Sequence, residues 1–214
     1  MTPELLILDL DGTLYTNHAL TKLYENCFEE FVAGELGVSR SLLLSRIGRM
    51  TDEYEKSFPC TPSRLSFLSQ FGIPLERWFE RSIRHINPQR YLRKESGLCE
   101  TLSQLSSINV VCTNNCRLQA ERTLEALGVA SCIDKIFSPD HPDMLKPSEH
   151  MYRQILDHYG ISAANGLVLG DRLIDILPAR SLGIPSVQVG VETLTSGSEG
   201  CREILTKLCD MTIL

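Results

Sequence analysis

The 214-residue sequence lacks the patterns that mark membrane proteins and nucleic-acid-binding proteins. No apolar run approaches the roughly 18 residues that a membrane-spanning helix needs. The first residues contain neither a basic region nor a long apolar stretch, so no signal peptide is expected. Lys and Arg form no run and the formal net charge is −6, which argues against a nucleic acid polymer as partner. We therefore expect a cytoplasmic protein without a membrane or nucleic acid partner.

The cysteines also lack a recognisable spacing. The eight cysteines are scattered along the chain and none belongs to a CxxC pair. Neither a metal-ligand spacing nor a disulfide framework follows from these positions. We therefore expect free thiols, buried or neutral, in a reducing cytosol.

Short apolar runs alternate with longer segments of helical period, and no internal repeat interrupts them. Strands are expected at residues 5–8, 108–112, 135–137, 167–169 and 186–189. Helices are expected at about 117–127, 148–159, 174–182 and 199–208, with Gly128, Gly160 and Gly183 near their C-terminal ends. Such alternation predicts parallel strands joined by right-handed crossovers, and hence a doubly wound, Rossmann-like α/β sheet.

Residues 16–88 follow a different pattern. They contain no convincing strand, but helical periodicity at about 20–36, 40–56, 62–71 and 75–86. Turn signals at 59–62 and 72–74 separate these segments. A helical block directly after the first strand predicts a cap domain at 16–88, inserted into a core domain formed by 1–15 and 89–214.

Two carboxylates follow the first expected strand. In an open parallel sheet, ligands collect outside the carboxyl ends of the strands. Asp9 and Asp11 are two residues apart, so on an extended chain they project to the same side. An aspartate can form a covalent acyl-phosphate, and a second carboxyl can protonate the leaving oxygen and then activate water. The alternative is a polar turn without chemistry.

Polar residues also follow other expected strands. Thr113 and Asn114 could bind a phosphate oxygen at a helix N-terminus, or only cap that helix. Lys146 could neutralise a nucleophile and a phosphoryl group, or lie on the surface. Asp171 and Asp175 are four residues apart and could hold Mg²⁺, or only begin a solvated helix.

Taken together, these residues predict a metal-assisted phosphoryl-transfer site. Asp9, Asp171 and Asp175 would crowd negative charge around a phosphate. At about 4 Å and an effective dielectric of about 20, each repulsion costs about 4 kcal/mol. Such a cluster needs a divalent cation and the ammonium group of Lys146. The cation would also polarise a phosphoryl group aligned with Asp9.

Four motifs lie in order along nearly the whole chain: Asp9-Leu-Asp-Gly-Thr-Leu14, Thr113-Asn114, Lys146-Pro147 and Gly170-Asp-x-x-x-Asp175. With these motifs the chain resembles phosphatases of the haloacid dehalogenase superfamily that carry a helical cap after the first motif. The resemblance implies that Asp9 is the nucleophile and a metal ligand. It implies that Asp11 is the general acid and base, with its main-chain carbonyl also on the metal.

The same resemblance implies roles for the later motifs. Thr113 and Lys146 would bind the transferring phosphoryl group. Asp171 would ligate Mg²⁺, and Asp175 would do so directly or through water. The cap would close over the site and select the substrate.

Within the superfamily, the Asp-Leu-Asp-x-Thr-Leu-Tyr run is similar to pyrimidine 5′-nucleotidases. Gly12 is common in phosphoglycolate-phosphatase-like members, in which a lysine is often found at the position of Asn115. Tyr15 and the cap arginines Arg46 and Arg49 are candidates for substrate contact, although for the two arginines a solvated helical face is the favoured interpretation. Arg172 could contact substrate or only form a salt bridge with Asp175, and we expect the salt bridge.

The leading hypothesis is a Mg²⁺-dependent hydrolase of a small phosphorylated metabolite, active as a monomer or homodimer. A phosphomutase of the same architecture would pass the phosphoryl group to a second sugar oxygen. A receiver domain uses an aspartate, a hydroxyl residue and a lysine in a similar way, but the chain length, the helical insertion and Asp11 argue against it. A scaffold without activity is the remaining alternative.

Overall fold

The computed structural model describes residues 2–95, 97–191 and 197–212. In this part of the chain, five parallel strands form one sheet in the order β3-β2-β1-β4-β5. The strands are β1 (Leu5–Leu8), β2 (Ile108–Cys112), β3 (Lys135–Phe137), β4 (Gly166–Gly170) and β5 (Ser186–Gln188). β1 lies at the centre, and each of its four residues is buried, as expected for a strand covered on both faces.

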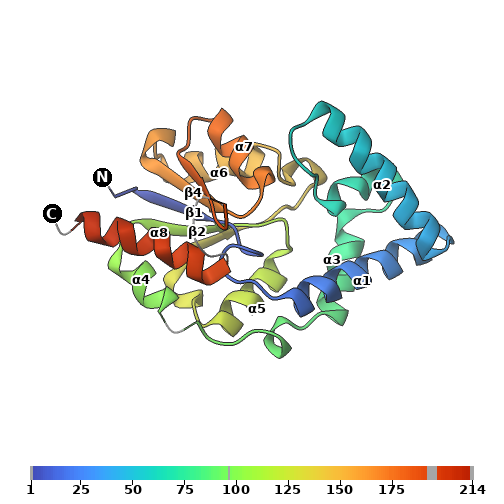
Figure 1. The fold of residues 1–214 in the computed structure, drawn as a ribbon, viewed down its shortest axis with the longest axis horizontal. Coiled ribbons are helices and arrows are strands. Elements are labelled where there is room, and N and C mark those ends of the chain that lie inside the picture. The colour runs from blue at the N-terminus through green and yellow to red at the C-terminus, as the bar shows by residue number, and fades with distance from the viewer. Residues whose placement is uncertain (1, 96, 192–196, 213–214) are drawn as a thin grey trace.

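Helices cover both faces of the sheet (Figure 1). Side chains alternate along β1, so its two faces pack against different helices. Leu5 and Ile7 pack in one cluster with Met151 and Ala179. The helices of that face are α6 (His150–Tyr159) and α7 (Leu173–Ser181).

The opposite face of β1 belongs to a second cluster. Leu6 and Leu8 pack there together with Leu102, Leu124 and Leu205. The helices of that face are α4 (Leu98–Gln104), α5 (Arg117–Leu127) and α8 (Gly197–Thr212). The two covered faces and the strand order confirm the predicted doubly wound α/β sheet.

The segment between β1 and α4 is helical wherever it forms regular structure. It contains α1 (His18–Leu36), α2 (Arg40–Ser57), α3 (Leu75–His85) and the 3₁₀ turns η1 (Arg64–Phe67), η2 (Ser69–Phe71) and η3 (Pro88–Arg90). In Figure 1, α1, α2 and α3 group together at the end of the molecule away from the marked chain ends. The cap boundaries 16–88 stay a prediction.

One predicted helix in this segment is wrong. Residues 62–71 form two 3₁₀ turns instead of one helix, because local capping interrupts the chain. The Ser63 hydroxyl accepts a hydrogen bond from the Leu65 N–H, and Gly72 ends η2 at a φ of 69°. α4 was not expected at all.

The prediction of free thiols is also wrong for two cysteines. Cys99 at the start of α4 and Cys132 in η4 (Ala130–Cys132) form a disulfide, with Cα atoms 5.8 Å apart. The packing of α4 against η4 brings them together across 33 residues, which spacing alone does not reveal. The other six cysteines are free and buried, as expected.

No helix in the described ranges combines the length and the apolar character that crossing a membrane requires.

An ion-pair network ties the helical segment together. Glu29 of α1 is only 3% exposed, and its carboxylate accepts hydrogen bonds at 2.6 Å from Arg40 of α2 and at 2.6 Å from Arg64 of η1. Glu35 and Arg77 form an ion pair at a more exposed position, between α1 and α3.

We predict that Glu29→Ala lowers the free energy of unfolding by about 2 kcal/mol, because both arginines lose a buried carboxylate. The matched control Glu35→Ala should cost less than about 1 kcal/mol, since its ion pair is solvated. Urea denaturation of both variants measures the difference. Equal losses would contradict a special role for Glu29.

Candidate active site

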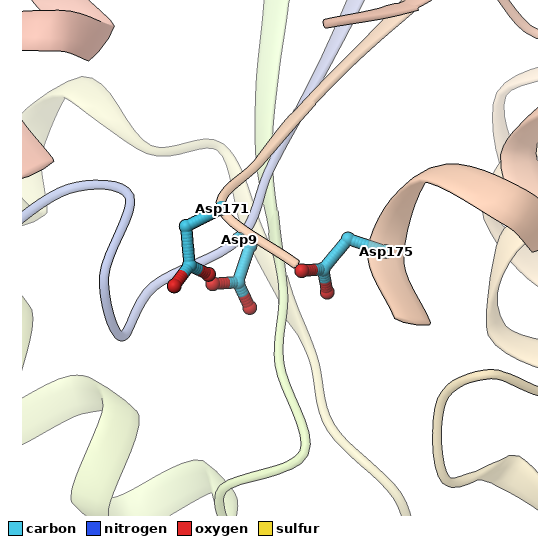
Figure 2. Close-up of side chains that lie close together, drawn as sticks. All are labelled: Asp9, Asp171 and Asp175. Atoms are coloured by element: carbon cyan, nitrogen blue, oxygen red, sulfur yellow. The ribbon is translucent and has the colours of Figure 1, made fainter. Parts of the chain in front are cut away.

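Three of the predicted carboxylates meet at the carboxyl end of the sheet. β1 and β4 are neighbours, and the Asp9 N–H donates to the carbonyl of Leu169 at 2.9 Å. Asp9 and Asp171 therefore leave adjacent strands side by side. Asp175 follows in the first turn of α7 (Figure 2). One carboxylate oxygen from each aspartate lies within 4.8 Å of the other two.

A buried ammonium group lies among these carboxylates. Lys146 is 2% exposed, and its Nζ donates to Asp9 Oδ1 at 2.5 Å and to the carbonyl of Cys112 at 2.9 Å. Asp175 Oδ1 is also 2.5 Å from Nζ, in an ion pair without hydrogen-bond geometry. Lys146 is therefore not a surface residue, and it partly neutralises two of the three carboxylates.

The pKa values of the lysine and the aspartates reflect their burial and the crowding of charge. Burial alone would lower the pKa of Lys146, but Asp175 and Asp9 together raise it well above the ordinary value. Burial and the charge of Asp175 raise the pKa of Asp9, against the opposing effect of Lys146. Burial and Asp175 likewise raise the pKa of Asp171 to about 6. One lysine therefore does not balance the cluster.

The residues fit a divalent cation. Oδ1 of Asp171 is buried and has no hydrogen-bond partner, and Oδ1 of Asp175 has only its ion pair with Lys146. Buried polar atoms are nearly always paired, so an unpaired carboxylate oxygen beside two further carboxylates indicates a cation site. Carboxylate oxygen is the donor type that Mg²⁺ prefers.

Two glycines let these carboxylates approach so closely. Gly12 has a φ of 94°, and a Cβ atom at this position would overlap the Asp171 carboxylate. A Cβ atom at Gly170 would overlap the side chain of Asp175. The glycines of the two motifs are therefore required by space at the site.

Thr113 and Asn114 lie beside Lys146. Thr113 is buried, and its Oγ1 accepts a hydrogen bond from the Asn115 N–H at 3.1 Å. The side chain of Asn114 pairs with the main chain of Lys146, accepting from its N–H at 2.8 Å and donating to its carbonyl at 3.2 Å. Asn114 therefore holds the lysine loop in place, a role that the sequence did not indicate.

Asp11 is bound by two donors. Its Oδ1 accepts a hydrogen bond from the hydroxyl of Tyr15, and its Oδ2 accepts one from Nδ2 of Asn115 at 2.9 Å. Burial raises the pKa of Asp11, and the two donors oppose that shift. Tyr15, a candidate for substrate contact, here contacts Asp11, and its contact with substrate stays a prediction.

Arg172 does not form the expected salt bridge. Its side chain instead donates to the carbonyl oxygens of Thr61 at 3.1 Å and Pro62 at 3.4 Å, in the loop before η1. The Asp175 carboxylate instead accepts a hydrogen bond from the Arg172 main-chain N–H at 3.2 Å, at the start of α7. Arg172 thus links the site to the helical segment.

The site opens into a cavity of about 240 Å³. All seven predicted site residues line it. The helical segment supplies further walls that the sequence analysis did not single out as site residues: Thr21, Tyr24, Glu25, Phe28, Ser63, Arg64, Leu65 and Trp78. Arg46 and Arg49 are not among the lining residues. These lining residues lie in α1, α3 and η1 or directly beside η1. Their proximity to the motifs depends on the tertiary structure, so the sequence pattern did not indicate it.

Residues 6–189 match the family model described as haloacid dehalogenase-like hydrolase. Since this match covers most of the chain, the chain belongs to that family. The predicted enzyme class, a phosphatase of the haloacid dehalogenase superfamily, is confirmed by this match together with the names of the relatives.

Two curated relatives are phosphatases. The phosphoglycolate phosphatase of Rhodospirillum rubrum is 27% identical over 207 residues, which cover 86% of this chain and 78% of the relative. The glyceraldehyde 3-phosphate phosphatase of Pyrococcus abyssi is 24% identical over 193 residues, covering 86% and 80%. The crystal structure of a phosphatase of the same superfamily from Thermococcus onnurineus shares the fold, with a TM-score of 0.59, 20% identity and coverage of 94% and 97%.

We predict that the metal-free protein loses stability as the pH rises through about 6. The pKa of Asp171 is higher in the folded chain than its ordinary value of 3.8. Ionisation therefore opposes folding, and the stability contributed by the protonated group is complete below the unfolded pKa and lost above the folded one. The loss should be on the order of 2 kcal/mol.

Urea unfolding in EDTA at pH 5 and pH 7.5 measures this loss. Asp171→Asn should flatten the pH dependence in that window, and Mg²⁺ should stabilise the wild-type protein more at pH 7.5 than at pH 5. Identical pH dependence of the wild type and the variant would contradict the prediction.

Proposed function

We propose that this protein is a Mg²⁺-dependent phosphomonoester hydrolase that forms an aspartyl-phosphate on Asp9. The observation that carries the proposal is the position of Asp9. This buried carboxylate lies against the Lys146 ammonium group at 2.5 Å and beside two further carboxylates at a cavity. Lys146 and a cation held by the carboxylates would together supply the positive charge that a nucleophile needs around it to receive a phosphoryl group.

Asp9, Asp171 and Asp175 are the residues that would hold Mg²⁺, together with the main-chain carbonyl of Asp11 that the family resemblance implies. When bound, the ion supplies positive charge that polarises the phosphoryl group. Thr113 and Lys146 would bind phosphoryl oxygens, and Asn114 would support this by fixing the main chain of Lys146. These residues also orient the phosphorus toward Asp9.

The reaction divides into two steps. In the first, an oxygen of the Asp9 carboxylate bonds to phosphorus while the bond to the leaving oxygen breaks. The leaving oxygen keeps the electron pair and takes a proton from the Asp11 carboxyl group. In the second, a water oxygen bonds to phosphorus and gives a proton to the Asp11 carboxylate, and the bond from Asp9 to phosphorus breaks. Inorganic phosphate leaves and Asp9 is regenerated.

We propose a small phosphorylated metabolite as the substrate class. The relatives named above act on phosphoglycolate and glyceraldehyde 3-phosphate. The cavity of about 240 Å³ has residues of α1, α3 and η1 on its walls, so the leaving group would contact the helical segment.

We predict that Asp9→Asn lowers kcat by about 10⁴-fold or more, because the amide is a poor nucleophile and removes a ligand from the cation site. The fold should persist, since the change is nearly isosteric and removes charge from a crowded cluster. Phosphate release with and without Mg²⁺, beside a thermal unfolding curve, measures both effects. Turnover close to that of the wild type would overturn the nucleophile assignment.

We predict that Asp11→Asn slows both steps, by about 10²- to 10⁴-fold, because an amide neither protonates the leaving oxygen nor accepts a proton from water. Slow hydrolysis should let the aspartyl-phosphate accumulate. Mass spectrometry of the intact variant after acid quenching would detect the added phosphoryl group on Asp9. Unchanged turnover would remove Asp11 from the mechanism.

A further inference from the structure

The two oxygens of the Asp11 carboxylate have chemically different partners. Oδ1 is bound by the hydroxyl of Tyr15, and Oδ2 is bound by Nδ2 of Asn115 at 2.9 Å. The two donors come from separate loops. Tyr15 follows β1 in the same loop as Asp11, and Asn115 lies between β2 and α5, 104 residues away in the sequence.

Both donors are anchored in the main chain of their loops. Tyr15 is buried, its carbonyl accepts the Gly12 N–H at 2.9 Å, and a main-chain bridge joins it to Asp11. Asn115 is held through its own N–H, which donates to Thr113 Oγ1 at 3.1 Å. The Asp11 carboxylate is therefore held between two fixed donors.

The two partners differ in the hydrogen bonds that they can form with the Asp11 carboxyl group. A side-chain amide N–H only donates, so toward Asn115 Oδ2 can only accept a hydrogen bond. A phenol hydroxyl both donates and accepts, so it can stay bonded to Oδ1 whether or not that oxygen carries a proton. The carboxyl group therefore keeps one contact on each oxygen in both of its protonation states, and the two contacts fix its orientation.

We infer that Tyr15 and Asn115 are positioning residues that fix the orientation of the Asp11 carboxyl group for proton transfer to the leaving oxygen. The inference rests on the proposed function, in which Asp11 is the general acid. In the first step the bond between a carboxyl oxygen of Asp11 and hydrogen breaks, its electron pair stays on that oxygen, and the proton moves to the leaving oxygen. Tyr15 and Asn115 both donate to the new carboxylate, which they stabilise.

The inference predicts that the loss of either donor lowers kcat/KM more for an ester whose leaving oxygen needs a proton than for one whose leaving oxygen does not. Phenyl phosphate and p-nitrophenyl phosphate have similar shapes, but nitrophenolate leaves readily without a proton and phenolate does not. kcat/KM reports the steps up to release of the leaving group. Tyr15→Phe and Asn115→Leu should each lower kcat/KM for phenyl phosphate about tenfold or more, and for p-nitrophenyl phosphate less than about threefold.

The experiment measures both esters with saturating Mg²⁺ for the wild type, Tyr15→Phe, Asn115→Leu, Asp11→Asn and Tyr54→Phe. Tyr54 lies in α2, stacks on Phe58 just after that helix and does not line the cavity, so it controls for the loss of a tyrosine hydroxyl. Asn115→Ala replaces Asn115→Leu if thermal unfolding shows that the leucine variant does not fold. Selective loss on phenyl phosphate in both donor variants, as in Asp11→Asn, supports the inference.

Two outcomes overturn it in distinguishable ways. Equal losses on both esters, or no loss on either, in folded donor variants would mean that Tyr15 and Asn115 do not position the Asp11 carboxyl group, while an active wild type leaves the proposed function standing. A folded wild-type protein that releases no phosphate from any phosphomonoester with Mg²⁺ would remove the proposed function itself, and the inference with it.

Discussion

The burial of the Lys146 ammonium group between Asp9 and Asp175 is the interaction on which the rest of the site depends. Three carboxylates at a buried sheet edge repel one another, and in partly desolvated surroundings each close pair costs several kcal/mol. Lys146 relieves part of this repulsion, and burial together with the remaining charge of Asp175 raises the pKa values of Asp9 and Asp171. The same imbalance that makes the cluster costly favours the binding of a cation, which the proposed function requires.

The sheet order explains how such a cluster is assembled. β1 lies between β2 and β4, so the loops that carry Asp9, Thr113 and Asp171 leave neighbouring strands at the same edge. Gly12 and Gly170 leave room for the carboxylates, and Asn114 fixes the Lys146 loop from the adjacent loop. The helical segment completes the cavity and is tied to the core by Arg172, which binds the carbonyls of Thr61 and Pro62.

The errors of sequence interpretation have a common physical origin. The run at 62–71 has helical period, but Ser63 and Gly72 cap shorter turns within it. Cys99 and Cys132 are distant in sequence and meet only because α4 packs on η4. Arg172 and Asp175 have suitable charges and spacing, yet the start of α7 turns the carboxylate toward the main chain and frees the guanidinium to reach the helical segment.

The sequence by itself determined the α/β class and predicted seven residues that the structure brings to one cavity, because strand periodicity and the position of ligands at the carboxyl ends of strands depend on local order along the chain. Only the tertiary structure decided how those residues are supported. The pairing of Asn114 with Lys146 and of Asn115 with Asp11 joins loops more than 30 and 100 residues apart. Contacts of that kind depend on which strands are neighbours and how closely their loops approach, and no local pattern encodes either.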